Sequence, residues 1–351
     1  MRRYAIWGTA TSPEHEAWVR SVGKQFEAHD FVAVDDIAEA DFVLNMFDPA
    51  DPKAFRRAAR GTYSAAFYEL PDAPKNALKE SYPMLVRTLS NVVLLRVPEK
   101  GVWFTTMEQG SYHVPEDPVV IYERLAPLAT SRLVIDNEWI PDLEPELWDG
   151  DDITVDIAEA GKRLDELDLL PSPFPVEEFL SGRDLRHVMR LYSVGGLSYG
   201  NLSARKDESR FWMSASGVDK SQLESVGRDI LMVKGFDDDR GVIVLSVPPG
   251  IEPRRVSVDA IEHWMIYQAH PEVGAILHVH AWMEGIAATD VNYPCGTQEL
   301  AVAVADLVAQ EPDPAHAVIG LRNHGITATG ESLSEILDRI EPSLLKQVPM
   351  S

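Results

Sequence analysis

Two histidines separated by one residue, His278 and His280, end a short apolar run over residues 275–280. Because successive side chains on a strand point to opposite faces, these two imidazoles would lie on the same face. Two imidazoles so close together can share one metal ion. A third histidine, His324, follows another apolar run over residues 317–321. We therefore expect two strands that bring His278, His280 and His324 together as the ligands of a metal ion.

The predicted ligand set is typical of a catalytic metal site. Three neutral imidazoles leave at least one coordination position open, whereas a structural site is closed by four protein ligands. Zinc and iron(II) both suit this set, and manganese would also fit it. The open position is where a substrate would bind.

The chain is acidic, with 56 Asp and Glu against 32 Lys and Arg among 351 residues, and its formal net charge is −24. Such a charge repels nucleic acid and anionic membranes, so we expect neither as a partner. A small anionic or carbonyl substrate in a locally polarised pocket remains compatible with it. The single cysteine, Cys295, permits no intrachain disulfide and favours a cytoplasmic location. No apolar run is long enough for a membrane span or a signal peptide.

The first 170 residues alternate between apolar stretches typical of strands and stretches with helical spacing. The predicted strands are at residues 3–7, 31–34, 41–47, 63–68 and 91–97. This alternation predicts a Rossmann-like parallel α/β domain over residues 1–170, whose role the sequence does not identify. Residues 8–12, Gly-Thr-Ala-Thr-Ser, would cradle a phosphate or, more simply, form the turn that caps a helix. A proline-rich segment, residues 169–175, predicts a linker before a second domain over residues 171–351.

Several short motifs of the second domain occur in an order that resembles the class II aldolase/adducin family, from about residue 176 to about residue 340. The motifs are Gly-Asn-Leu-Ser-Ala-Arg at 200–205, Ser-Ala-Ser-Gly at 214–217, His-Val-His at 278–280, Gly-Thr-Gln-Glu-Leu at 296–300 and Asn-His-Gly at 323–325. The resemblance implies a three-layer α/β/α domain, a divalent metal, usually zinc, and a homo-oligomer, commonly a tetramer. The metal-binding histidines of the family match His278, His280 and His324. Non-enzymatic members have lost these ligands, and this chain retains all three.

The resemblance also implies a pocket for a phosphate or carboxylate group of the substrate. Its residues match Asn201, Ser216, Gly217 and Ser257. The family normally has two adjacent serines before its catalytic acid, and Val258 replaces one of them. We therefore expect a weaker phosphate site and a preference for a carboxylate or aromatic substrate.

The catalytic acid of the aldolases is a glutamate one helix before the first ligand histidine, and Asp259 matches its position. Aspartate keeps the charge but is shorter by one methylene group. Glu262, one helical turn further on, is the second candidate for the catalytic acid. An alternative role for Asp259 is to cap the helix that follows it.

These features predict a divalent-metal-dependent lyase. It would cleave a C–C bond, by aldol cleavage or decarboxylation, in a small hydroxy or oxo acid or a related carbonyl compound, through a metal-stabilised enediolate. Three alternatives remain: a non-haem iron oxygenase on the same scaffold, a metal-dependent epimerase, and a non-catalytic, adducin-like interaction protein.

Overall fold

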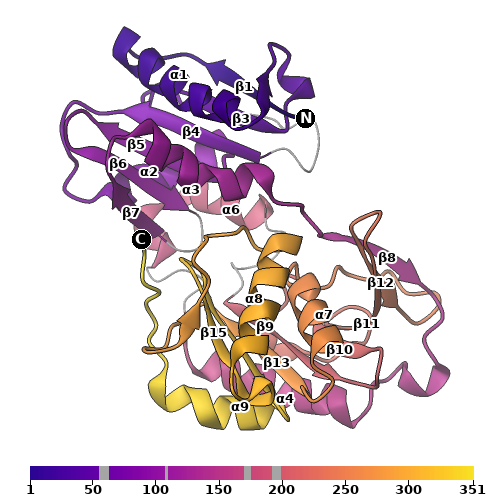
Figure 1. The fold of residues 1–351 in the computed structure, drawn as a ribbon. Coiled ribbons are helices and arrows are strands. Elements are labelled where there is room, and N and C mark those ends of the chain that lie inside the picture. Colours follow the sequence, from indigo (N-terminus) through magenta and orange to yellow (C-terminus); the bar gives the residue numbers. More distant parts are fainter. Residues whose placement is uncertain (55–62, 107–109, 170–174, 192–198) are drawn as a thin grey trace. The chain divides into compact units, whose positions relative to one another are not determined.

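The computed structural model describes residues 1–54, 63–106, 110–169, 175–191 and 199–351 (Figure 1). Contacts divide the chain into two compact units. The first comprises residues 1–130, 172–191 and 350–351, and the second comprises residues 131–171 and 192–349. Among the described helices, none is both long and apolar enough to cross a membrane.

The first unit contains a seven-stranded sheet with the strand order β2-β1-β3-β4-β5-β6-β7. Its strands are β1 (Arg2–Gly8), β2 (Phe31–Ala33), β3 (Phe42–Met46), β4 (Tyr63–Glu69), β5 (Val92–Val97), β6 (Gly101–Thr106) and β7 (Gly110–Val114). Its helices are α1 (Pro13–Ala28), α2 (Ala77–Thr88), α3 (Pro118–Thr130), α5 (Val176–Phe179) and α6 (Gly182–Leu191). Neighbouring strands from β2 to β5 are parallel, whereas β5, β6 and β7 pair antiparallel.

The expected α/β class is confirmed for this unit, but the Rossmann-like assignment is not. The five predicted strand segments correspond to β1 to β5. A Rossmann sheet has the order 3-2-1-4-5-6, whereas the parallel strands here follow 2-1-3-4-5 and continue into an antiparallel hairpin. Strand order depends on the crossovers between strands, which apolar alternation does not determine.

The second unit contains a nine-stranded sheet with the order β14-β15-β16-β13-β9-β10-β11-β12-β8. Its strands are β8 (Asp136–Ile140), β9 (Gly200–Arg205), β10 (Phe211–Ser214), β11 (Ile230–Asp237), β12 (Val242–Ser246), β13 (Ala275–Val279), β14 (Ala287–Ala288), β15 (Val318–Leu321) and β16 (Gly325–Gly330). Its helices of eight or more residues are α4 (Asp152–Glu166), α7 (Ala260–Ala269), α8 (Gln298–Gln310) and α9 (Leu333–Ile340).

A single boundary near residue 170 does not describe this division. Residues 131–171 belong to the second unit, and residues 172–191 belong to the first. Strand β8 pairs with β12, and α4 buries Ile157 and Leu164 in the core of the second unit. The segment with α5 and α6 groups instead with the first unit, where Asp184 of α6 pairs with Arg87 of α2 at 2.8 Å. The centre of the predicted linker, residues 170–174, lies outside the described residues.

Helices cover both faces of the second sheet. Asn201 on β9, His278 on β13 and Thr327 on β16 are adjacent in register, so their side chains share one face. Helix α7 packs on this face and contacts α8, as Figure 1 also shows. Trp212 points to the opposite face, where its indole N–H donates to Asp151 at the start of α4. The expected three-layer arrangement is therefore present in the second unit.

Two glycines allow the neighbouring strands to approach the strand that carries His278. A Cβ atom on Gly200 of β9 would lie 2.2 Å from the carbonyl oxygen of His278. A Cβ atom on Gly325 of β16 would lie 2.2 Å from the carbonyl oxygen of Val279. Both contacts are with backbone, which cannot move without breaking the sheet.

Substitution of Gly325 by alanine should therefore destabilise the second unit. We expect Gly325→Ala to lower the free energy of unfolding by about 1–3 kcal/mol, as overpacking does in protein cores. Gly235→Ala is the matched control, because a Cβ there would lie at an ordinary 3.5 Å from the nearest atom, on Val244. Urea unfolding of both variants measures the difference. Equal stabilities would show that the strands tolerate the extra methyl group.

Candidate metal centre

Local backbone structure brings the three histidines to one end of the sheet. His278 lies on β13, and His280 follows directly after it. His324 lies in the turn between β15 and β16, where Asn323 has a φ of 58° and the N–H of His324 donates to the carbonyl of Leu321 at 2.9 Å. Because β16 pairs with β13, this turn lies beside the end of the His278 strand.

The three imidazoles form a compact cluster. One ring nitrogen of each histidine lies within 4.8 Å of those of the other two. The ring centroids are 5.3 Å apart for His278 and His280, 4.8 Å for His278 and His324, and 5.1 Å for His280 and His324. His278 and His324 are only 1% and 2% exposed, and His280 is half-buried. The three histidines therefore lie together as predicted, although β16, and not the predicted strand before His324, is the strand that pairs with β13.

The electrostatics of the cluster keep two of its rings neutral. Burial lowers the pKa of His278 well below its usual value, and the neighbouring His324 and His280 lower it further. Burial, with His280 as a second cause, lowers the pKa of His324 to about 3. Within the described chain, Nε2 of His278 and Nδ1 of His324 have no hydrogen-bond partner. Buried nitrogens with free lone pairs are costly to leave unpaired, and a divalent metal ion would satisfy them.

Asp259 lies beside this cluster. It immediately precedes α7, but its side chain makes no capping hydrogen bond to the helix. Its carboxylate instead accepts a 2.7 Å hydrogen bond from the amide nitrogen of Asn201, the residue directly across from His278. Asp259 is 6% exposed. The structure thus connects the first predicted acid to the His278 strand through Asn201, and it gives no support to the helix-capping alternative.

Glu262, on α7, is connected to the cluster by Thr327. It is 2% exposed and accepts a hydrogen bond from the hydroxyl of Thr327, whose oxygen is 3.3 Å from Nδ1 of His278. Burial raises the pKa of Glu262 to about 8, and the charge of Asp259 acts in the same direction. Sequence reasoning missed Thr327. The available signal was its position three residues after His324, on a strand that pairs with the histidine strand.

The predicted anion-binding residues come from segments that run side by side. Ala215 and Val256 form an antiparallel bridge, and the hydrogen bonds beside it place Ser216 opposite Arg255 and Ser257 opposite Ser214. The N–H of Ser257 donates to Ser214 at 3.3 Å. Gly217 has a φ of 65°, a conformation that favours glycine. Ser257 lies two residues before Asp259, which Asn201 contacts, so Asn201 and Ser257 both lie near the start of α7.

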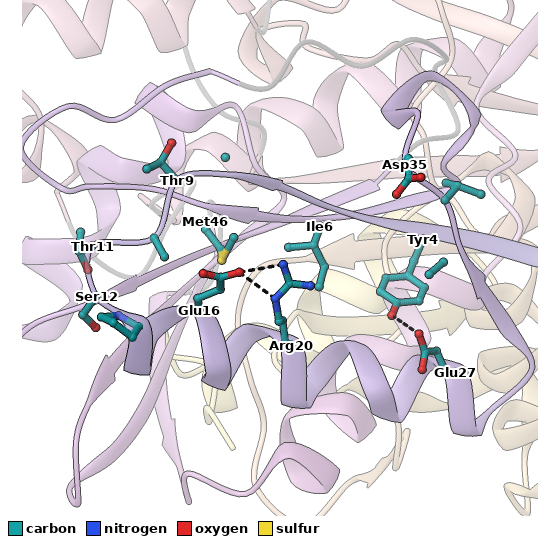
Figure 2. Close-up of a pocket in the computed structure, with 15 residues that line it drawn as sticks. Tyr4, Ile6, Thr9, Thr11, Ser12, Glu16, Arg20, Glu27, Asp35 and Met46 are labelled. Atoms are coloured by element: carbon teal, nitrogen blue, oxygen red, sulfur yellow. Dashed lines mark hydrogen bonds and ion pairs between the residues drawn. The ribbon is translucent and has the colours of Figure 1, made fainter.

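The predicted turn at residues 8–12 begins α1 as expected, since the hydroxyl of Ser12 accepts from the N–H of His15 at 3.0 Å. A separate pocket of about 750 Å³ adjoins this turn (Figure 2). Glu16 and Arg20, which line it, form an ion pair at 2.7 Å, and Figure 2 shows Tyr4 donating to Glu27 farther along α1. Its charged lining residues are Glu16, Arg20, Glu27 and Asp35. Three acids and one already paired arginine give little attraction for a phosphate.

Comparisons with known proteins match a part of the chain that carries His278 and His280. The model of the family described as Class II Aldolase and Adducin N-terminal domain matches residues 185–290. The matched residues include His278, His280 and Asp259, and the match confirms the predicted resemblance to the class II aldolase/adducin family for this part of the chain.

Curated relatives match over a similar region. The methylthioribulose-1-phosphate dehydratase of Leptospira biflexa is 29% identical over 111 residues, which is 31% of this chain and 49% of the relative. The enzyme of the same name from Citrobacter koseri is 35% identical over 95 residues, 27% of this chain and 41% of the relative. The chain thus spans about half the length of these relatives or less. A solved L-fuculose 1-phosphate aldolase is 20% identical with a TM-score of 0.38, covering 55% of this chain and 81% of that one.

The cluster should bind one zinc ion per chain. We expect His278→Ala and His324→Ala each to weaken zinc binding at least about 100-fold, because each removes one of the protein's three ligands. His316→Ala is the matched control, since that histidine bonds Asp313 outside the cluster. Competition with a chromophoric chelator measures the affinities. Wild-type affinity in the two cluster variants would contradict the predicted site.

The neutral state of two of the rings predicts the number of protons that zinc displaces at pH 6. Histidines with the ordinary pKa of about 6.5 would together release about two protons from three ligands. Lowered pKa values keep His278 and His324 unprotonated at this pH, so only His280 can contribute, and at most one proton should be released. Calorimetric titration with zinc in buffers of different ionisation enthalpy counts the protons. Release of about two would contradict the lowered pKa values.

Proposed function

We propose that this protein is a divalent-metal-dependent lyase that acts on a small carbonyl substrate. The observation that carries the proposal is the cluster of His278, His280 and His324, with Asp259 held beside it by Asn201. An acid next to a metal site is the combination that proton transfer beside a carbonyl group requires.

The three histidines would hold the metal, with zinc the first candidate and iron(II) or manganese the others. A divalent ion bound there would act as a Lewis acid toward an oxygen of the substrate. The buried, neutral rings of His278 and His324 would keep their lone pairs available for it. Metal dependence is also the expectation for the class II aldolase family.

Asp259 would be the group that moves a proton. The hydrogen bond from Asn201 fixes one of its oxygens and stabilises the ionised form, which is the form a general base needs. In one direction it would remove a proton next to the carbonyl group, and in the other it would return it. Because only 6% of Asp259 is exposed, bulk water has little access to compete for that proton.

Ser216, Gly217, Ser257 and Asn201 would bind an anionic group of the substrate. Val258 contributes no hydroxyl to this set. This favours a carboxylate over a phosphate and hence cleavage of a C–C bond in a hydroxy or oxo acid, by aldol cleavage or decarboxylation. We include in the proposal that the protein forms a homo-oligomer, as the family resemblance implies.

The names of the relatives favour a second candidate, the elimination of water from a phosphorylated substrate. Dehydration breaks a C–O bond but begins with the same removal of a proton next to a carbonyl group. The same residues would therefore act in both reactions, and the substrate alone distinguishes them.

Replacement of Asp259 should separate catalysis from metal binding. We expect Asp259→Asn to lower kcat by about 100- to 10,000-fold, the usual contribution of a general acid or base, while zinc stays bound. The assay uses the zinc-loaded protein with a panel of hydroxy acids, oxo acids and sugar phosphates. Asp313→Asn is the control, because Asp313 is exposed and its side chain bonds Ala315 and His316, outside the cluster.

Other outcomes of this assay would identify the competing functions. Oxygen uptake by the iron-loaded protein would indicate an oxygenase, and inversion of a substrate without loss of a fragment would indicate an epimerase. Absence of bound metal and of turnover would contradict the lyase and favour an adducin-like interaction protein. Undiminished turnover in Asp259→Asn would exclude the role given to this residue.

A further inference from the structure

Thr327 connects the ligand histidine His278 to a buried carboxyl group. In the pairing of β13 with β16, Thr327 lies directly across from His278, so the two side chains are neighbours on one face of the sheet. The hydroxyl oxygen of Thr327 is 3.3 Å from Nδ1 of His278. The same hydroxyl donates a short hydrogen bond to Oε1 of Glu262, on the helix that covers this face. All three residues are at most 2% exposed.

The direction of these hydrogen bonds determines which nitrogen of His278 carries a proton. A hydroxyl group has one proton and can accept through its lone pairs. Because Thr327 gives its proton to Glu262, its oxygen can only accept from His278. Nδ1 of His278 must then be the protonated nitrogen. The lone pair of the neutral ring is consequently on Nε2, the nitrogen that has no partner in the described part of the chain.

We infer that Thr327 and Glu262 are positioning residues that fix the tautomer and the orientation of His278 and so reserve its Nε2 for the metal. This inference rests on the proposed metal site and deepens it. It assigns Glu262 a role exerted through Thr327, and it leaves Asp259, which contacts Asn201, as the residue that transfers a proton. Ligand histidines in metal sites commonly donate their other N–H to such a partner.

The neighbouring Thr329 serves as a comparison, because the hydrogen bonds of its side chain are with backbone groups. Thr329 lies two residues farther along β16 and is fully buried. Its hydroxyl donates to the carbonyl of Pro314 and accepts from the N–H of Ala317, so it joins backbone segments and contacts no histidine ring. Thr327→Val and Thr329→Val thus make the same change on the same strand, and only the first removes the contact with His278.

Zinc affinity and the tautomer of His278 test the inference. We expect Thr327→Val to weaken zinc binding by about 10- to 100-fold, the usual effect of removing such a partner, and Thr329→Val to change it by less than about twofold. In the metal-free protein, nitrogen NMR of labelled histidine should show His278 protonated on Nδ1 in the wild type and a mixture of tautomers in Thr327→Val. Equal zinc affinities of the two valine variants, or an Nε2-protonated ring in the wild type, would overturn the inference.

Variants of Glu262 distinguish positioning from acid–base catalysis. A glutamine side chain would keep an oxygen that can accept from Thr327, so Glu262→Gln should retain zinc affinity within about threefold, whereas Glu262→Leu should lose about 10-fold or more. Equal loss in both variants would contradict the positioning role. If the wild type bound none of zinc, iron(II) and manganese, the proposed function would fail, and the tautomer measurement, which needs no metal, would still decide the role of Thr327.

Discussion

The close approach of three backbones at one end of the second sheet is the constraint on which the candidate site depends. Gly200 and Gly325 let β9 and β16 pack against the strand of His278 with no side chain in between. Register then places Asn201 on one side of His278 and Thr327 on the other. Each of these neighbours bonds a different acid at the start of α7, so the glycines indirectly determine where both carboxyl groups lie.

Burial controls the charge state of this site more strongly than the overall charge of the protein does. A net charge of −24 would favour protonated histidines at long range, yet the pKa values of His278 and His324 are lowered. Removal of the rings from water disfavours their charged form, and their mutual proximity adds to this. A site built in this way offers neutral ligands at neutral pH even on an acidic protein.

The sequence predicted those parts of the site that local patterns encode. Alternation placed His278 and His280 on one face, and the short motifs located His324, Asn201 and Asp259. The contact of Thr327 with His278 and the place of β8 in the second sheet both depend on which strands pair. No local sequence pattern determines pairing between segments that are distant in the chain. The strand order of the first sheet was missed for the same reason, because its crossovers and not its apolar runs determine it.

Asp259 and Glu262 show why spacing alone could not separate the two candidate acids. They lie one helical turn apart, and either would be acceptable as the acid that precedes the histidine strand. Their partners differ: Asn201 gives Asp259 a donor that stabilises a charge, whereas burial raises the pKa of Glu262 and its hydrogen bond leads through Thr327 to a ring nitrogen. A carboxyl oxygen that accepts from Thr327, which in turn contacts a ligand histidine, is suited to orient that ligand. A carboxylate that accepts from Asn201, beside the histidine strand, is suited to take a proton, and this difference in partners is the basis for the two proposed roles.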